Sequence, residues 1–68
     1  MRVLETVALT VDLPEKGLRR GQVGTIVEEL GPDVFEVEFA DPDGRAYAFA
    51  AVDASRLMPL LHEIANAN

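Results

Sequence analysis

The residues whose side chains could do acid–base or nucleophilic chemistry do not gather into a catalytic set. An enzymatic site needs a nucleophile, an acid or base, and a pocket that holds both. His62 is the single histidine, and neither it nor Ser55, which precedes it in the sequence, has supporting residues around it. We therefore predict that the protein is not an enzyme and that His62 lies at the surface.

Two pairs of carboxylates stand close together in the sequence. Glu36 and Glu38 alternate with apolar residues, which is typical of a strand with one face in water. Asp41 and Asp43 belong to an Asp-Pro-Asp-Gly turn, and the chain lacks the further oxygen ligands at alternating positions that a calcium loop provides. Cysteine is absent, which also excludes disulfides and thiolate metal sites. The sequence predicts no metal and no cofactor.

The charged residues are unevenly distributed. Twelve acidic residues against six basic ones give a net charge of −6, so nucleic acid and anionic membranes meet net repulsion. Half of the basic residues nevertheless lie close together as Lys16, Arg19 and Arg20, and Arg45 joins them if its turn folds nearby. This cluster is a candidate nucleic-acid contact. It is opposed by carboxylates on the following segments and by an expected lack of exposed aromatic residues for base stacking.

The pattern of apolar and turn-forming residues predicts an all-β domain. Period-two alternation is clearest at residues 34–39, and the turn residues at 41–44 predict a hairpin. Its second strand carries Tyr47 and Phe49 on one face and alanines on the other. We expect a small five-stranded SH3-like barrel over residues 1–60. The expected strands are residues 7–11, 23–30, 34–39, 45–52 and 57–59.

The connections and the C-terminal residues complete this prediction. Residues 13–21 have the composition of a long irregular loop, and residues 53–57 that of a helical turn capped by Asp53. Residues 61–68 are expected to form a tail outside the barrel, helical at first and then frayed. The opening residues lack the pattern of a signal peptide and no apolar run is long enough to cross a bilayer, so we expect a cytoplasmic protein without a membrane partner.

An apolar stripe is expected at the C-terminal end. Leu60, Leu61 and Ile64 share one face of the short helix predicted there, behind a proline suited to the first helical turn. The stripe docks either on its own barrel or on another copy of the chain. Docking on another copy predicts a homo-oligomer.

Several segments resemble one bacterial family. They are residues 4–9, 12–14, 18–28, 37–39, 43–45 and 57–60, among them Asp43-Gly44-Arg45. These segments are similar to those of domain-of-unknown-function family 4926, whose members are small stand-alone proteins. The resemblance implies an SH3-like barrel. It also implies an accessory or antitoxin-like role, because genes of this type are thought to lie beside another small gene.

The glycine segment at residues 18–28 is similar to two further groups. One is the nucleic-acid-binding KOW motif of ribosomal proteins and transcription elongation factors, and the other is the barrel of the nitrile hydratase β subunit. The physical demand is shared: Gly21 allows the loop to turn into the strand, and Gly24 allows a sharp bend or the close approach of another backbone.

We therefore predict a non-catalytic protein-interaction module whose partner is another, basic protein. The alternative is a KOW-like nucleic-acid-binding domain that uses the loop at residues 16–20. The candidate interaction residues are Lys16, Arg19, Arg20, Glu36, Glu38, Arg45, Leu60, Leu61 and Ile64.

Overall fold

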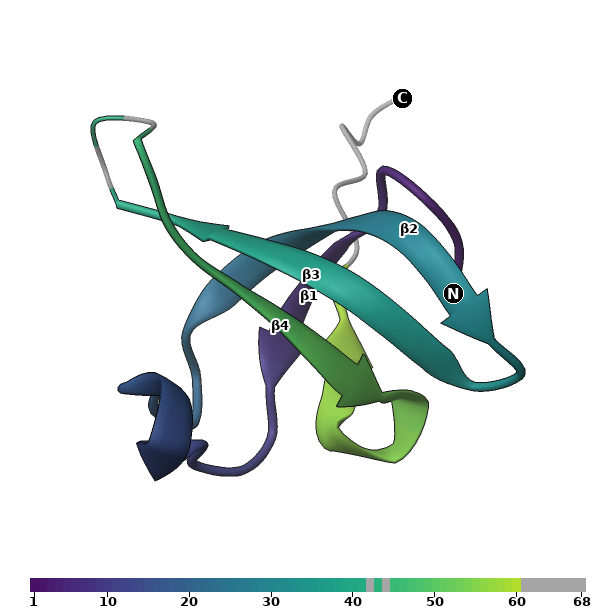
Figure 1. Cartoon of the computed structure of the whole chain (residues 1–68), viewed down its shortest axis with the longest axis horizontal. Coiled ribbons are helices and arrows are strands. Elements are labelled where there is room, and N and C mark those ends of the chain that lie inside the picture. The colour runs from purple at the N-terminus through teal and green to yellow at the C-terminus, as the bar shows by residue number, and fades with distance from the viewer. Residues whose placement is uncertain (42, 44, 61–68) are drawn as a thin grey trace, which may run out of the picture.

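The computed structural model describes residues 1–41, 43 and 45–60, and within them the chain forms one antiparallel sheet (Figure 1). The sheet order is β4-β3-β2-β1-β5, and the connections contain two 3-10 turns. The elements are β1 Thr6–Leu9, η1 Pro14–Lys16, β2 Val23–Gly31, β3 Val34–Ala40, β4 Ala46–Asp53, η2 Ala54–Arg56 and β5 Leu57–Pro59. The predicted all-β fold with five strands is confirmed.

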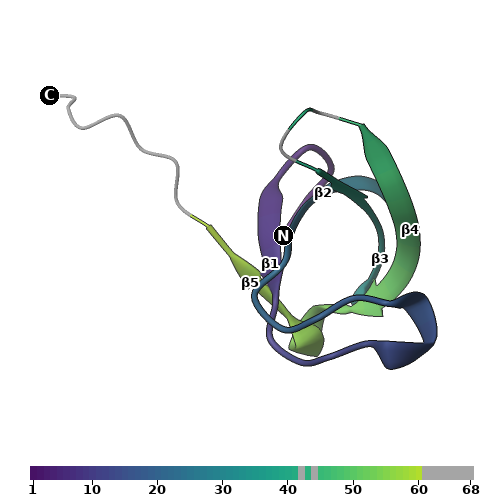
Figure 2. The ribbon, with the colours of Figure 1, turned by 90° about the vertical axis from the view of Figure 1, so that its left-hand side faces the viewer.

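The sheet curls strongly but does not close. Figure 2 shows the strands bending around a common centre, with β4 and β5 as the two edges. β5 is three residues long and pairs only with β1, and η2 joins β4 to β5 without any pairing between these two strands. The expected five strands are therefore present as an open, curled sheet that is not closed into a barrel.

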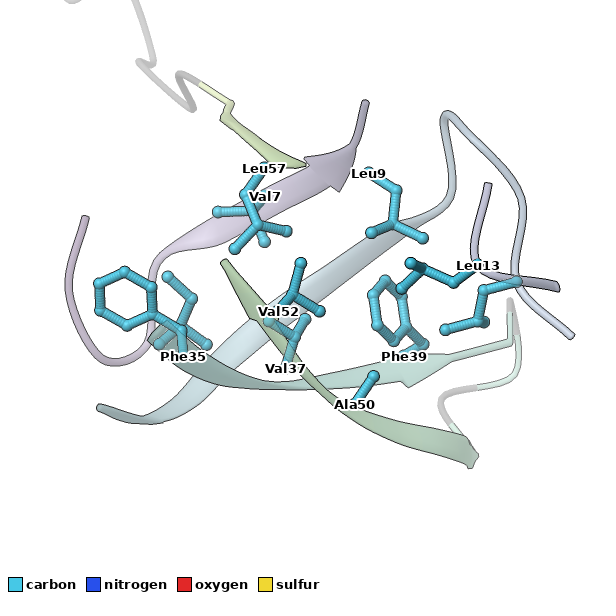
Figure 3. Close-up of a cluster of buried hydrophobic side chains, with 11 residues drawn as sticks. Val7, Leu9, Leu13, Phe35, Val37, Phe39, Ala50, Val52 and Leu57 are labelled. Atoms are coloured by element: carbon cyan, nitrogen blue, oxygen red, sulfur yellow. The ribbon is translucent and has the colours of Figure 1, made fainter. Parts of the chain in front are cut away.

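The core fills the inside of the curl, and it is built by alternation. Phe35, Val37 and Phe39 of β3 point inward, as the period of two predicts (Figure 3). Two of the three inward positions on β4 hold alanine: Ala48 lies opposite Phe39, and Ala50 lies opposite Val37. The other core residues are Val7, Leu9, Leu13, Leu18, Ile26, Val52 and Leu57. No polar or charged side chain that the structure describes is buried.

Two glycines occupy positions that no other residue fits well. A Cβ on Gly24 would lie 2.7 Å from Val37 Cγ1 and 2.8 Å from the carbonyl oxygen of Glu38, so β2 and β3 approach closely only because Gly24 has no side chain. Gly21 has a φ of +94°, where the loop turns into β2. Both predicted glycine roles are confirmed, with close approach as the role of Gly24.

Three details of the connections differ from the prediction. The first strand ends at Leu9, although Thr10 N still donates in register to the carbonyl of Arg56, which belongs to η2. The loop expected to be irregular contains η1. Leu13 before η1 and Leu18 after it pair with each other and pack in the core. Asp53 precedes η2, but its side chain makes no capping hydrogen bond.

The predicted C-terminal helix does not begin at Leu60. Leu60 N donates to the Thr6 carbonyl at 3.0 Å, so this residue continues the pairing of β5 with β1. The rest of that prediction, with Leu61, His62 and Ile64, lies outside the described residues.

Candidate functional site

The three predicted basic residues of the first connection lie together and are exposed. Lys16 closes η1, and Arg19 and Arg20 follow in the next turn. Their backbone is held by side chains, because Arg19 N donates to Gln22 Oε1 at 2.6 Å and Arg20 N donates to Asp12 Oδ1 at 2.8 Å. The cluster thus has a fixed backbone with one carboxylate directly beside it.

Arg45 does not join this basic cluster. It lies at the connection between β3 and β4, which is separate from η1 in both views of the ribbon (Figures 1 and 2). Asp41 Oδ1 accepts hydrogen bonds from the backbone nitrogens of Asp43 and Arg45, each at 3.0 Å. The Asp41 carboxylate is therefore used to shape the turn, as the sequence reading of this segment favoured over metal binding.

Glu36 and Glu38 lie on the outer face of β3, and both are half-buried. Glu36 lies directly opposite Glu28 of β2, so two carboxylates face each other across the strands. Glu38 lies opposite Thr25 on one side and Phe49 of β4 on the other. The solvated carboxylate face predicted from the alternation is present.

Beside these carboxylates, β4 exposes two aromatic side chains. Tyr47 and Phe49 are 47% and 51% exposed. The prediction that exposed aromatic residues are lacking is therefore wrong, and the reason is the register that places alanines inward. We call the surface formed by Glu36, Glu38, Tyr47 and Phe49 the β4 face.

The side chain of Gln22 connects the β4 face to the basic connection. Its Nε2 donates to the hydroxyl of Tyr47, while its Oε1 accepts from the backbone nitrogen of Arg19. One amide group thus bridges residues that are far apart in the sequence. Tyr47 lies between the carboxylates of β3 and the basic residues of the first connection.

A second apolar surface lies across β2, β1 and β5. Ala8 pairs with both Val23 and Met58, whose side chains are about half exposed on either side of it. The small alanine leaves a shallow hollow of about 470 Å³ between them. Leu60 and Arg20, two of the predicted interaction residues, both line this hollow.

Within residues 1–41, 43 and 45–60, no group of three or more histidine, cysteine, aspartate or glutamate residues could hold a metal ion. Across the same part of the chain, none of the helical segments has the length and apolar character needed to cross a bilayer.

The comparisons with known proteins identify a family and no function. Residues 3–59 match the family model described as Domain of unknown function (DUF4926). No curated protein and no solved structure matches the chain.

Proposed function

The chain belongs to the DUF4926 family, as its motifs predicted, and from this premise we propose that it is a non-catalytic protein-interaction module that binds another protein through the β4 face. The family match covers residues 3–59, which include all five strands, so the proposed module is the domain that defines the family. The family's description names no activity. The proposal therefore depends on the surface itself.

The observation that carries the proposal is the exposed aromatic pair. Tyr47 and Phe49 leave about half of their side-chain surface in water, while the same strand turns alanines toward the core. Tyrosine and phenylalanine are enriched in the buried centres of protein interfaces, where a few such residues carry most of the binding energy. A partner that covers both rings removes apolar area from water at little conformational cost.

The surrounding charges define the partner's chemistry. Glu36 and Glu38 border the aromatic pair, and Glu28 extends the carboxylates onto β2. Together with the net charge of −6, these groups favour a basic partner and speed its encounter by electrostatic steering. We propose an accessory or antitoxin-like partner of one basic bacterial protein in the cytoplasm, in which apolar side chains of that protein cover the rings and its cations meet the carboxylates.

A KOW-like nucleic-acid-binding function is the second candidate. It is favoured by one observation: Gln22 connects the exposed ring of Tyr47 to the backbone of Arg19, so a stacking group lies beside the basic connection. It is opposed by Glu38, which lies opposite the second ring, and by the net charge, because both repel phosphate groups. The acidic surroundings favour the protein partner.

Affinity capture from cells that make the protein tests the proposed function. The bait is compared with the variant Tyr47→Ala/Phe49→Ala and with the control Leu30→Ala, because Leu30 is 47% exposed on β2 and lies outside the β4 face. We expect one partner in stoichiometric amount with the natural protein and the control, and its loss with the double variant. Absence of such a partner, or its retention by the double variant, would overturn the proposal.

A further inference from the structure

The free edge of β4 is unprotected. On its other side β4 pairs with β3, and no strand of the described chain pairs with the free edge. Among the residues that the structure describes, no backbone hydrogen bond outside the β3 ladder involves residues 46–53. The seven residues from 46 to 52 contain no charge and no proline, which are two of the usual means of preventing edge-to-edge pairing. The register shift between Phe39 and Ala40 leaves Tyr47 without a partner on β3, and from Ala48 to Asp53 the strand is regular.

The two ends of β4 carry opposite charges. Arg45 immediately precedes the strand and Asp53 is its last residue. Both are exposed, the Asp53 side chain makes no capping bond, and neither side chain forms an ion pair within the described residues. In an antiparallel pair of two such strands each Arg45 meets an Asp53, whereas a parallel pair would bring like charges together.

We propose that β4 pairs antiparallel with β4 of a second copy, with the two-fold axis at Phe49. In this register the two Phe49 residues lie opposite each other, Ala48 lies opposite Ala50, and Arg45 lies at the end of the interface where the second copy carries Asp53. The two sheets become one continuous sheet, and the interface is closed by its symmetry. The exposed aromatic residues stay on the outer surface, where the two β4 faces adjoin.

This inference goes beyond the proposed function and does not depend on it. Pairing uses the β4 backbone and the charges of Arg45 and Asp53, whereas partner binding uses the side chains of the β4 face. Capture of the partner by a monomeric variant would separate the two, because it would retain the function without the dimer.

Reversal of the two charges tests the pairing. Sedimentation equilibrium at low salt should show the mass of the natural protein rising with concentration from 7.4 kDa toward twice that value. Arg45→Asp and Asp53→Arg should each weaken the dimer about tenfold or more, because each places like charges together at both ends of the interface. The double variant Arg45→Asp/Asp53→Arg should restore it. A mass of 7.4 kDa at all concentrations, or no restoration by the double variant, overturns the proposal.

Engineered cysteines test the register. The natural chain has no cysteine, so Phe49→Cys introduces a single thiol that faces its own copy across the axis. Opposed residues of antiparallel strands have Cα atoms roughly 4.5–5.5 Å apart, which a disulfide can span. In the control Tyr47→Cys, the two thiols are separated by four strand positions, about 13 Å. We expect rapid cross-linking of Phe49→Cys alone. Equal rates for both variants, with circular dichroism showing both folded, overturn the register.

Discussion

Glu38 on β3 lies directly opposite Phe49 on β4, which places a carboxylate beside a half-exposed aromatic ring. The β4 face is therefore acidic and aromatic at the same place. An aromatic ring that served only the core would point inward, and that position is held by alanines on β4. Glu38 and Phe49 together show the pattern of the β4 face, which has aromatic residues at its centre and carboxylates beside them.

Substitution of Gly24 should destabilise the domain more than substitution of Gly31. In Gly24→Ala the new methyl group meets the backbone of Glu38 and the side chain of Val37, so the strands must move apart. We expect the free energy of unfolding to fall by about 1–3 kcal/mol. Urea denaturation measures it. Gly31→Ala is the control, because no atom lies within 4 Å of a Cβ at Gly31, and its effect should stay within about 1 kcal/mol. Equal effects would contradict the close approach.

Replacing Glu28 should stabilise the domain. Glu28 lies opposite Glu36, and like charges in directly opposed positions of a sheet are unfavourable. Glu28→Lys should raise the free energy of unfolding by about 0.2–1 kcal/mol at low salt, and the gain should shrink as salt is added. Glu29→Lys serves as the control, because Glu29 lies opposite Phe35. A gain that is the same for both variants would argue against the specific repulsion.

The carboxylates of the β4 face should act mainly on the rate of partner association. In Glu36→Gln/Glu38→Gln the steering charges are lost while the shape is kept, so association at low salt should slow by about tenfold. Stopped-flow kinetics at several salt concentrations measures the change, which should vanish at high salt. Glu15→Gln/Glu29→Gln removes the same two charges from η1 and β2, outside the β4 face, and should have a smaller effect. Equal slowing by this control would assign the effect to net charge.

The basic connection should be dispensable for partner binding. Arg19 and Arg20 are exposed but lie outside the β4 face, so Arg19→Ala/Arg20→Ala should change the affinity for the partner by no more than about twofold. Fluorescence anisotropy with a single-stranded oligonucleotide tests the second candidate with the same variant. Binding that falls steeply with salt and disappears in the variant would favour the nucleic-acid function.

The strand pattern could be predicted from the sequence because it depends on local alternation. Phe35, Val37 and Phe39 point inward as predicted, since each apolar residue on β3 is flanked by a polar or exposed one. The turn at residues 41–45 could also be predicted, because aspartate side chains often accept hydrogen bonds from nearby backbone nitrogens in turns. Asp41 does so here, from the backbone nitrogens of Asp43 and Arg45.

The β4 face could not be predicted because it depends on register. Alternation showed that Tyr47 and Phe49 share a face, but only the pairing of Ala48 with Phe39 and of Ala50 with Val37 shows which face is inside. Large residues on β3 require small ones opposite them in a core this narrow. The sequence signal that could have found it is the match of alanines on one strand to bulky residues on the other.

Contacts between residues that are far apart in the sequence could not be predicted either. The contact of Gln22 with Tyr47 joins residues 25 positions apart, and the pairing of Leu60 with Thr6 joins the two ends of the described chain. Whether the sheet closes could not be predicted either. The residues of β5 do not indicate that this three-residue strand pairs with β1 alone and leaves the sheet open.

The most direct measurement maps the partner's contact on the isotope-labelled domain by nuclear magnetic resonance. Titration with the captured partner should shift the amide resonances of Glu38, Tyr47 and Phe49 most strongly and leave those of Lys16 and Leu30 largely unchanged. Shifts concentrated at Lys16, Arg19 and Arg20, with β4 unaffected, would contradict the account that the exposed aromatic pair and its carboxylates form the binding surface.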